Sequence, residues 1–360
     1  MTDVLKRFGV DRDNLPDHVP ATKPYPTPVL GRVAHIDADF MAYQAAADRR
    51  DELDGTKPRK TVAEKCERAK RGLDHLMRAS ASTNYIAHIT PGGSDKGGRD
   101  GFAITLPYQG NRLDRERPEH LDQVRAYIST LSCKVHLDQE ADDGMAQANY
   151  QAIASGCGNL SVIVSKDKDL RMVPGLHYDF DTEQVVAVGD TFGWLWIDSS
   201  KSSKTLKGWG TKFFWAQCLM GDTADNIRGL PFITFRALDA LGKAPTTLNK
   251  LNQRLQSVGD KNRRTLLDNI EVEEVKTKKV GAIMAFDLLA DCNNDAECFQ
   301  RVRGLFKDSS AAFPDDFIHH RTQMRVTGTQ ALLGDMRLLW MRRTKDPDDV
   351  LHWLKEERLL

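Results

Sequence analysis

The sequence predicts an α/β fold, in which helices flank a central and mostly parallel β-sheet. Short apolar or β-branched runs, such as residues 32–37 and 160–164, are typical of buried parallel strands. Acidic residues follow both runs, and residues 141–153 carry apolar side chains at helical spacing between them. Ligands bind beyond the carboxyl ends of strands in such sheets, so the acids at these positions predict a functional site.

The composition is that of an ordinary water-soluble protein. The chain has 360 residues, 40% of them hydrophobic, and 51 basic residues balance 51 acidic ones. A formal net charge of zero neither supports nor excludes a nucleic-acid partner. The six cysteines lack zinc-site spacing, no run approaches the roughly 18 apolar residues of a membrane span, and no signal pattern is present. We therefore expect a cytoplasmic protein without a membrane partner.

The first third of the chain alternates strands and helices. Residues 1–30 are rich in proline, which predicts an extended arm. The run at 32–40 predicts a strand that ends in Asp37 and Asp39 and leads into a helix. An amphipathic helix is expected at 61–80, followed by a strand at 84–90.

A basic segment at about 94–120 interrupts this alternation. It is rich in glycine and arginine, and it places Tyr108, Arg112, Arg115 and Arg117 close together. Long irregular loops in compact domains are usually functional or disordered. Beside an acidic site, this one suggests a clamp over a phosphodiester backbone, although an ordinary mobile loop would have a similar composition.

The middle of the chain continues the α/β pattern. We expect a helix at 120–131, a strand at 134–137, a helix opening near residue 141, and several strand-like segments from residue 175. The segment 199–212 contains four lysines, including Lys212, and no acid. A helix from 209 to 220 should lead into Asp222 and Asp225, whose spacing would place both on one helical face.

The last third contains one further candidate site. Lys276, Lys278 and Lys279 precede Gly281 at an expected helix start. Backbone N–H groups at a helix N-terminus, with lysines beside them, can bind phosphate without reading sequence. Solvated lysines at an ordinary helix start remain the alternative. Residues 311–360 read as helical scaffold.

Four acidic groups therefore recur where strands end or helices begin. Any one of them could be a helix cap or a solvated loop. Together they predict one site for divalent metal, and oxygen-only ligands favour magnesium or manganese over zinc. Two such ions would suit a displacement at phosphorus, with nearby arginines neutralising the phosphoryl oxygens. The groups are Asp37 with Asp39, Glu140 with Asp142 and Asp143, Asp167 with Asp169, and Asp222 with Asp225.

The motifs HIDADF, YQGNR, EADD, SKDKDL and GDTADNIRGLP, in this order, resemble the 5′-nuclease (flap endonuclease) superfamily over about residues 32–305. They look most like phage 5′→3′ exonucleases and are similar to the 5′-nuclease domain of bacterial DNA polymerase I. The resemblance implies a PIN/5′-nuclease-like fold with a helical arch and a C-terminal helix–three-turn–helix region. It also implies magnesium-dependent hydrolysis of DNA, and often RNA, from 5′ ends or at flaps.

By position, the resemblance implies that all nine acids of the four groups are metal ligands. It implies that Arg99 and Arg112 meet the scissile phosphate, that Tyr108 is the aromatic residue of the arch, and that Gly281 with Lys278 and Lys279 binds duplex DNA. We add Arg115 and Lys212 as DNA contacts from the two basic segments. The implied partners are DNA duplexes with a 5′ end or flap, RNA–DNA hybrids and phage replication proteins, in a bacterial cytoplasm if the chain is phage-encoded.

The chain departs from the family pattern at three places. Gln109 stands where the arch usually has a catalytic lysine, so Arg112, Arg99 or Lys96 would have to supply that charge. The strand ending at Thr90 is not followed directly by an acid, and Asp95 is the nearest substitute. A long insertion separates RGLP at 228–231 from the lysine–glycine element.

The expected organisation is an arm at 1–30, a nuclease core at 31–225 with the arch at about 94–120, a DNA-binding region at 226–310 and a scaffold at 311–360. Three alternatives remain at this stage. A haloacid-dehalogenase-type phosphatase would use HIDADF and GDTADN but leave EADD and SKDKD without a role. A non-catalytic DNA-binding replication factor of the same fold is favoured by Gln109. A PIN-type ribonuclease is typically shorter and lacks the glycine–lysine element.

Overall fold

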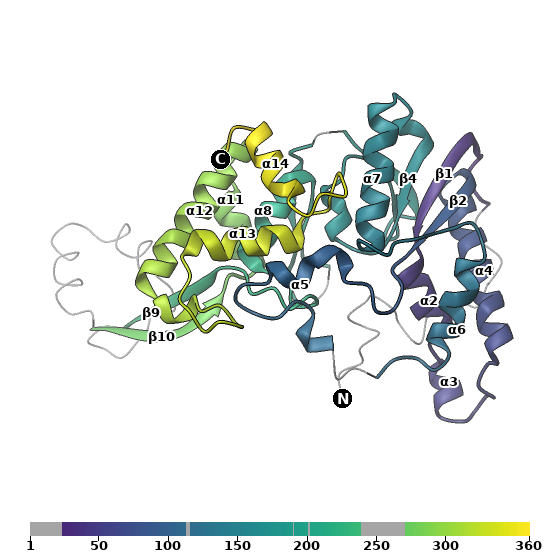
Figure 1. Cartoon of the computed structure of the whole chain (residues 1–360), viewed down its shortest axis with the longest axis horizontal. Coiled ribbons are helices and arrows are strands. Elements are labelled where there is room, and N and C mark those ends of the chain that lie inside the picture. Colours follow the sequence, from purple (N-terminus) through teal and green to yellow (C-terminus); the bar gives the residue numbers. More distant parts are fainter. Residues whose placement is uncertain (1–23, 113–115, 190, 201, 239–270) are drawn as a thin grey trace.

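The computed structural model describes residues 24–112, 116–189, 191–200, 202–238 and 271–360. A six-stranded sheet and a group of C-terminal helices lie side by side along its long axis (Figure 1). The predicted α/β fold with a mainly parallel sheet is confirmed.

The sheet has the strand order β3-β2-β1-β4-β5-β6. All neighbours pair in parallel except β5 and β6, which are antiparallel. Every residue of β4 is buried, as expected of a central strand covered on both faces. The strands are β1 (Val29–Asp37), β2 (Ser82–Ile89), β3 (Cys133–Val135), β4 (Ser161–Val164), β5 (Gly175–Asp179) and β6 (Gln184–Val188).

Three helices from the N-terminal part of the chain form a hydrophobic core with the sheet. They are α2 (Ala38–Ala46), α4 (Val62–Ala79) and α6 (Leu121–Ser129), which pack on one another. The short α3 (Arg50–Leu53) lies between α2 and α4 in the chain. The expected helix at 61–80 is confirmed: Thr61 caps α4 by accepting a hydrogen bond from the Glu64 amide, and Leu73 is fully buried.

A second core joins α7 (Ala141–Ala154) to the C-terminal helices. Those helices are α8 (Gly210–Met220), α11 (Ala282–Leu289), α12 (Asp295–Ala312), α13 (Gly328–Leu339) and α14 (Asp349–Glu356). At its centre the Trp340 and Trp353 rings stack with centroids 4.5 Å apart, and Phe214 meets Trp340 edge-on at 5.0 Å. Residues from the segment 311–360 contribute to this core, and residues 338–342 also contact Arg99 and Asp143.

The basic segment does not form a long helix within its described part. It contains the short turns Lys96–Gly98 and Gly110–Arg112 and the four-residue α5 (Arg99–Phe102). Within its described residues, the segment therefore consists of short turns and one short helix, and does not form the helical arch that the resemblance implies. Arg115 lies outside the described residues.

Two antiparallel ribbons stand apart from the sheet. One pairs β7 (Trp194–Asp198) with β8 (Thr205–Trp209), so part of the lysine-containing segment 199–212 is a strand. The other pairs β9 (Pro231–Leu238) with β10 (Glu271–Lys279) and forms the base of the insertion after RGLP. It extends beyond α12 at the far end of the molecule (Figure 1).

None of the helices in the described ranges has both the length and the apolar character that crossing a membrane requires. The six cysteines are free.

Candidate metal centre

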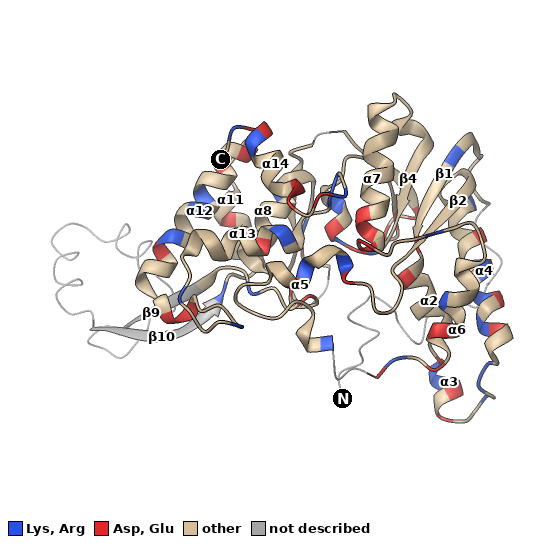
Figure 2. Cartoon of the chain, in the orientation of Figure 1, with Lys and Arg blue, Asp and Glu red and all other residues tan. Residues whose placement is uncertain are grey.

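Segments far apart in the sequence bring acidic side chains to the carboxyl end of the sheet. Asp37 is the last residue of β1, and β4, which pairs in parallel with β1, leads into Asp167 and Asp169. The first turn of α7 adds Asp142 to this edge, and its acids show in red at the lower end of that helix (Figure 2). The sequence-based expectation that acids at strand ends converge is thus met by the geometry.

The first acid group consists of Asp37, Asp142 and Asp167. Asp37 accepts hydrogen bonds from the Phe40 amide and from the Ser165 hydroxyl, each at 3.0 Å. Burial and then the Asp39 charge raise the pKa of Asp37 to about 6. Burial, followed by the charges of Asp37 and Asp167, raises the pKa of Asp142 well above its usual range.

One oxygen of this group lacks any donor. Asp142 Oδ1 is buried and has no hydrogen-bond partner among the described residues. An unpaired buried carboxylate oxygen is costly, and carboxylates crowded together repel one another unless a cation lies between them. The first acid group therefore has the chemistry of a cation site.

The second acid group consists of Asp169, Asp222 and Asp225. One carboxylate oxygen from each lies within 4.8 Å of the other two, close enough to share one ion. Asp222 and Asp225 are not on a helical face as expected. They belong to a turn closed by a bridge between Asp222 and Ile227, since α8 ends at Gly221, whose φ is +65°.

Lys168 lies inside the second acid group. Its ammonium is 2.7 Å from Asp169 Oδ1 and 2.7 Å from Asp222 Oδ2. Although burial works in the opposite direction, this ammonium lowers the pKa of Asp222. Gln217 of α8 also donates a hydrogen bond to Asp169 Oδ1. The ammonium thus takes up part of the space in which an ion would meet these carboxylates.

Glu140 lies between the acids and the basic segment. Its carboxylate pairs with Arg99 Nε at 2.9 Å and accepts hydrogen bonds from the Tyr108 hydroxyl at 3.1 and 3.2 Å. The Lys96 ammonium lies 3.8 Å away. Burial raises the pKa of Glu140, while the Arg99 charge opposes that rise. Glu140 can still take part in binding a cation, because it lies at the partly exposed rim of the site.

The surroundings of Arg99 and Asp143 correct two expectations. Both side chains are fully buried and form an ion pair of 2.7 Å. Arg99 also donates to the carbonyl oxygens of Leu338 and Trp340, and Asp143 accepts from the Arg342 amide at 3.0 Å. Arg99 therefore cannot meet a phosphate, and the charge of Asp143 is already neutralised. The pair fastens the start of α7 to the C-terminal segment.

Asp39 is also occupied by protein donors. One oxygen pairs with Arg125 at 2.6 Å, and the other accepts a hydrogen bond from the Thr90 amide at 3.0 Å. Asp39 therefore ties α2 to α6 and to the end of β2, which suits it less for binding an ion. Thr90, which stands where the family often has an acid, accepts a hydrogen bond from the Ala141 amide at 2.8 Å and so anchors the start of α7.

Residues 107–112, which we call the strap, cross from Glu140 to the second acid group. Gln109 donates to Asp225 Oδ1 at 2.9 Å, and its backbone amide donates to the Asp225 carbonyl at 2.8 Å. Arg112 pairs with Asp225 and donates from Nε to the Ala224 carbonyl at 3.1 Å. The strap thus places Tyr108 and Arg112 beside the acids, and it places the Gln109 side-chain amide against the Asp225 carboxylate.

The proposed DNA contacts lie at two different places. The Lys279 ammonium donates to Thr223 Oγ1 at 3.0 Å, next to the second acid group. Gly281 is the N-terminal cap of α11, as expected, whereas Lys278 and Lys279 belong to β10. Lys212 points elsewhere: its ammonium donates to the Cys292 carbonyl at 2.8 Å, so it does not support the predicted DNA contact.

Sequence reasoning missed several residues that complete this centre. Lys168 was passed over although it stands between Asp167 and Asp169, where any lysine must lie near their carboxylates. Gln217 carries no sequence signal, because a lone glutamine has many ordinary roles. Only the packing of α8 against the turn at Asp169–Met172 brings it to the acids. Ser165 opens the SKDKDL motif but was given no role, and the pairing of β4 with β1 brings it to Asp37.

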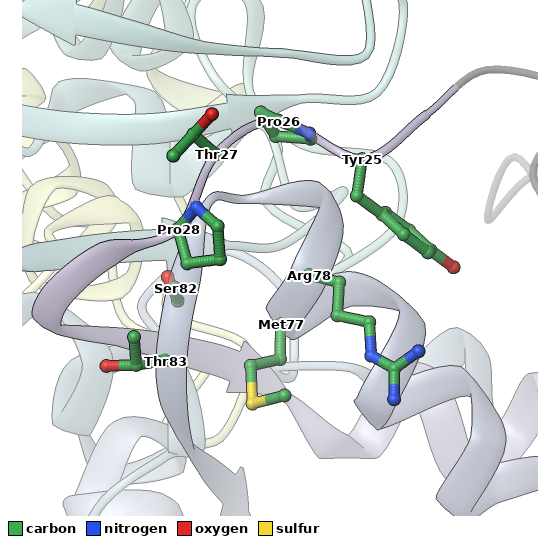
Figure 3. A pocket seen from close by; sticks show the side chains of 8 residues that line it. All are labelled: Tyr25, Pro26, Thr27, Pro28, Met77, Arg78, Ser82 and Thr83. Atoms are coloured by element: carbon green, nitrogen blue, oxygen red, sulfur yellow. The ribbon is translucent and has the colours of Figure 1, made fainter.

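A cavity of about 630 Å³ lies away from these acids. It is lined by residues 25–28 of the N-terminal segment and by Met77, Arg78, Ser82 and Thr83 (Figure 3). These residues lie at or next to the amino ends of β1 and β2, whereas Asp37 lies at the carboxyl end of β1. The cavity is therefore not part of the acidic centre.

The donor set fits divalent metal. It consists of carboxylate oxygens alone, which suits magnesium or manganese. The unpaired Asp142 oxygen and the three converging oxygens of the second acid group are the features that an ion would satisfy.

No protein-family model matches the sequence, and no curated protein matches it. Among solved structures, the chain is similar to the T5 D15 protein co-crystallised with metal ions, at 14% identity and a TM-score of 0.38, over 86% of this chain and 89% of that one. It is similar to the bacteriophage T5 flap endonuclease in a pseudo-enzyme–product complex with DNA and metal ions, at 15% identity and a TM-score of 0.36, over 86% and 99%.

A mutant T5 5′-exonuclease is similar at 13% identity and a TM-score of 0.34, over 86% of this chain and 97% of that one. The similarities are distant, and the chain's function has to be argued from its own residues.

Proposed function

We propose that this chain is a divalent-metal-dependent nuclease that hydrolyses DNA phosphodiester bonds from a 5′ end or at a 5′ flap. The observation that supports it best is the convergence of two carboxylate groups at the carboxyl end of a parallel sheet, one with an unpaired buried oxygen and one with three oxygens within 4.8 Å. A site of this composition suits phosphoryl transfer with metal assistance.

The first and second acid groups would each hold one Mg²⁺ or Mn²⁺ ion, and Glu140 would contribute from the rim of the first. Bound there, such ions activate a water molecule and stabilise the leaving oxygen at phosphorus. Asp39 and Asp143 are left out of this ligand set, because Arg125 and Arg99 already neutralise them.

The basic side chains around the acids would neutralise the phosphate. Arg112 from the strap and Lys168 lie within hydrogen-bond reach of site carboxylates, so either can also reach a phosphoryl oxygen bound there. The Tyr108 hydroxyl, which donates to Glu140, would hold that carboxylate in place. Arg112 and Lys168 thus take the role that the family usually gives to the lysine at the position of Gln109.

Duplex DNA would lie on the side of the C-terminal helices. Lys279 projects next to Thr223, and the backbone amides at the start of α11 follow Gly281. Such an arrangement grips a phosphate backbone without reading its sequence, so binding should weaken as salt rises. RNA–DNA hybrid is a further substrate to test, since the resemblance includes enzymes that also cleave RNA.

The test is digestion of end-labelled duplex, 5′-flap and RNA–DNA hybrid substrates with magnesium or with a chelator. We expect cleavage that releases label from the 5′ end only when magnesium is present. Asp167→Asn and Asp169→Asn should nearly abolish cleavage while duplex binding remains measurable. Asp138→Asn is the matched control, because Asp138 precedes α7 but pairs with Lys345 on the surface. Unchanged turnover in both site variants would refute the proposal.

The same experiment separates the second candidate, a non-catalytic DNA-binding replication factor. That candidate is favoured by Gln109, whose amide rather than an ammonium lies against Asp225. Magnesium-independent binding of flaps with no cleavage of any substrate would support it over the nuclease.

A further inference from the structure

The site residues form a row. Lys279 contacts Thr223, which is next to Asp222 in the chain. From Asp222 the row continues through Lys168 to Asp169, then to Asp167, Ser165, Asp37 and Phe40, and its hydrogen bonds are each between 2.7 and 3.0 Å. One end lies by β10 and α11, in the left half of Figure 1, and the other lies at the start of α2, which is in the right half. Lys279 marks the first end.

The second end carries an aromatic pair with a cation on it. The rings of Phe40 in α2 and Phe180, which follows β5, meet edge to face with centroids 6.5 Å apart. The Lys166 ammonium lies 5.2 Å from each ring centroid. Both rings are partly exposed, Lys166 is exposed, and all three follow the carboxyl ends of β1, β4 and β5. This cluster therefore adjoins the first acid group directly.

We propose that Phe40, Phe180 and Lys166 form a binding site for one unpaired nucleotide, the one on the 5′ side of the scissile phosphate. The base would stack on the ring face that the ammonium now covers, and the ammonium would move to the phosphate of that nucleotide. The proposal rests on the proposed nuclease function, because that function sets which strand crosses the row. The site would add a contact to the 5′ end of the cleaved DNA strand. Neither the four acidic groups nor the lysine–glycine element supplies such a contact.

The exchange of ammonium for base is physically favourable. A base stacked on an aromatic side chain contributes more than an exposed cation–π contact does. Lysine has a flexible four-carbon stem, so its ammonium can leave the rings and still reach a neighbouring phosphate.

The position of the cluster explains why the ligand is an unpaired nucleotide and not duplex. Duplex held near Lys279 and α11 reaches the row from the side of the C-terminal helices. The DNA strand that crosses the acids would then reach Phe40, where the aromatic pair can stack with one base. Stacking is tolerant of base identity, because every base has a π face, so the site should show little sequence preference.

The test uses a duplex with a short 5′ overhang that carries 2-aminopurine at the nucleotide next to the scissile phosphate, in a chelator so that no cleavage occurs. We expect the intact protein to quench the fluorescence on binding. Phe180→Leu should lose this quenching and weaken binding about fivefold, the low end of the contribution of one stacked base. Phe180→Tyr should keep both, and Trp194→Leu is the control for an exposed aromatic residue on the β7–β8 ribbon.

A second arm leaves the protein unchanged and removes the base. An abasic site at the same nucleotide should weaken binding of the intact protein as much as Phe180→Leu does. The Phe180→Leu variant should bind the normal and the abasic substrates equally. Lys166→Met should weaken binding of both substrates, because the phosphate is present in each. Equal affinity of the intact protein for the normal and abasic substrates would overturn the proposal.

The two proposals fail in different ways. Quenching that depends on Phe180, without cleavage in magnesium, would leave the nucleotide site standing and refute the nuclease. Cleavage in magnesium, with quenching that is unaffected by Phe180→Leu, would leave the nuclease standing and refute the nucleotide site.

Discussion

Acidification should destabilise this fold through a row of buried histidines beneath the acidic centre. His35 Nδ1 lies 3.0 Å from His88 Nε2, and His88 Nδ1 lies 2.9 Å from His136 Nε2, so the three rings link β1, β2 and the segment after β3 by hydrogen bonds. Burial is the main reason that the pKa of His35 and of His136 falls to about 4. It lowers the pKa of His88 well below its usual range, with His35 and His136 adding to the effect.

The sign and size follow from proton linkage. The unfolded chain binds protons on these rings below about pH 6.5, while the folded protein does not until about pH 4, so stability falls as the pH drops between these values. For a ring with a folded pKa of about 4, the free energy of unfolding should fall by about 2 kcal/mol between pH 7 and pH 5. His35 and His136 together should therefore lower the free energy of unfolding by about 4 kcal/mol between pH 7 and pH 5.

Buried acids with raised pKa values, among them Asp37, Asp142 and Asp335, act in the opposite direction. The pKa of Asp37 is raised to about 6 and that of Asp335 to about 7, in both cases chiefly by burial. Over the pH ranges between their usual and their raised pKa values, the folded protein binds protons on these groups that the unfolded chain does not. The total pH dependence is therefore a difference of opposing contributions, and a single histidine has to be isolated by a variant.

The assay is urea unfolding of the unmodified chain and of His35→Gln at pH 7, 6 and 5. His35 is chosen because it ends the row, so the hydrogen bond between His88 and His136 can remain. The variant should be less stable at pH 7, having lost a buried hydrogen bond, but should lose about 2 kcal/mol less on going to pH 5. Parallel pH profiles for the two proteins would refute the reasoning.

Three substitutions test other parts of the site. Lys168→Met should bind Mn²⁺ several-fold more tightly in calorimetry without DNA, since it removes an ammonium that competes for two carboxylates; equal affinity would argue against this competition. Arg99→Met should lower the free energy of unfolding by about 3–5 kcal/mol, because it leaves the charge of Asp143 buried without its partner, and an unchanged urea midpoint would contradict this. Gly144→Ala should lower stability by about 1–3 kcal/mol, as its Cβ would meet His136 Cε1 at 2.0 Å; thermal unfolding at pH 7 measures the loss.

The sequence predicted those parts of the site that depend on local structure. Asp37 and Asp167 could be placed because each follows an apolar run, and parallel strands bring their carboxyl ends to one edge. Glu140 and Asp142 could be placed because apolar residues recur at helical spacing over 141–153, which predicts a helix that begins at these acids. These predictions needed only the type of each element and the direction in which it runs.

Other parts depended on contacts between distant segments, which no local pattern encodes. Arg99 reads as an exposed cation in a glycine-rich loop, yet residues 337–342 cover it and supply its carbonyl partners. Lys212 likewise reads as a free cation in a lysine-rich segment, but it meets the Cys292 carbonyl. The turn holding Asp222 was mistaken for helix, because the left-handed Gly221 that ends α8 has no signal apart from its residue type.

The distribution of cations sets the two acid groups apart. In the second group, Lys168 pairs with Asp169 and Asp222, and Arg112 pairs with Asp225, so an ion that enters must displace side chains already bound there. In the first group, the described contacts of Asp37 are two neutral donors, and Asp142 Oδ1 has none. Apart from the Lys168 charge, which acts on Asp167, the repulsion within this group is relieved by protons, as the raised pKa values of Asp37 and Asp142 indicate, or by a divalent ion. We infer that the first group binds its ion more tightly, and that the second group fills when substrate phosphate draws Lys168 and Arg112 away from their carboxylates.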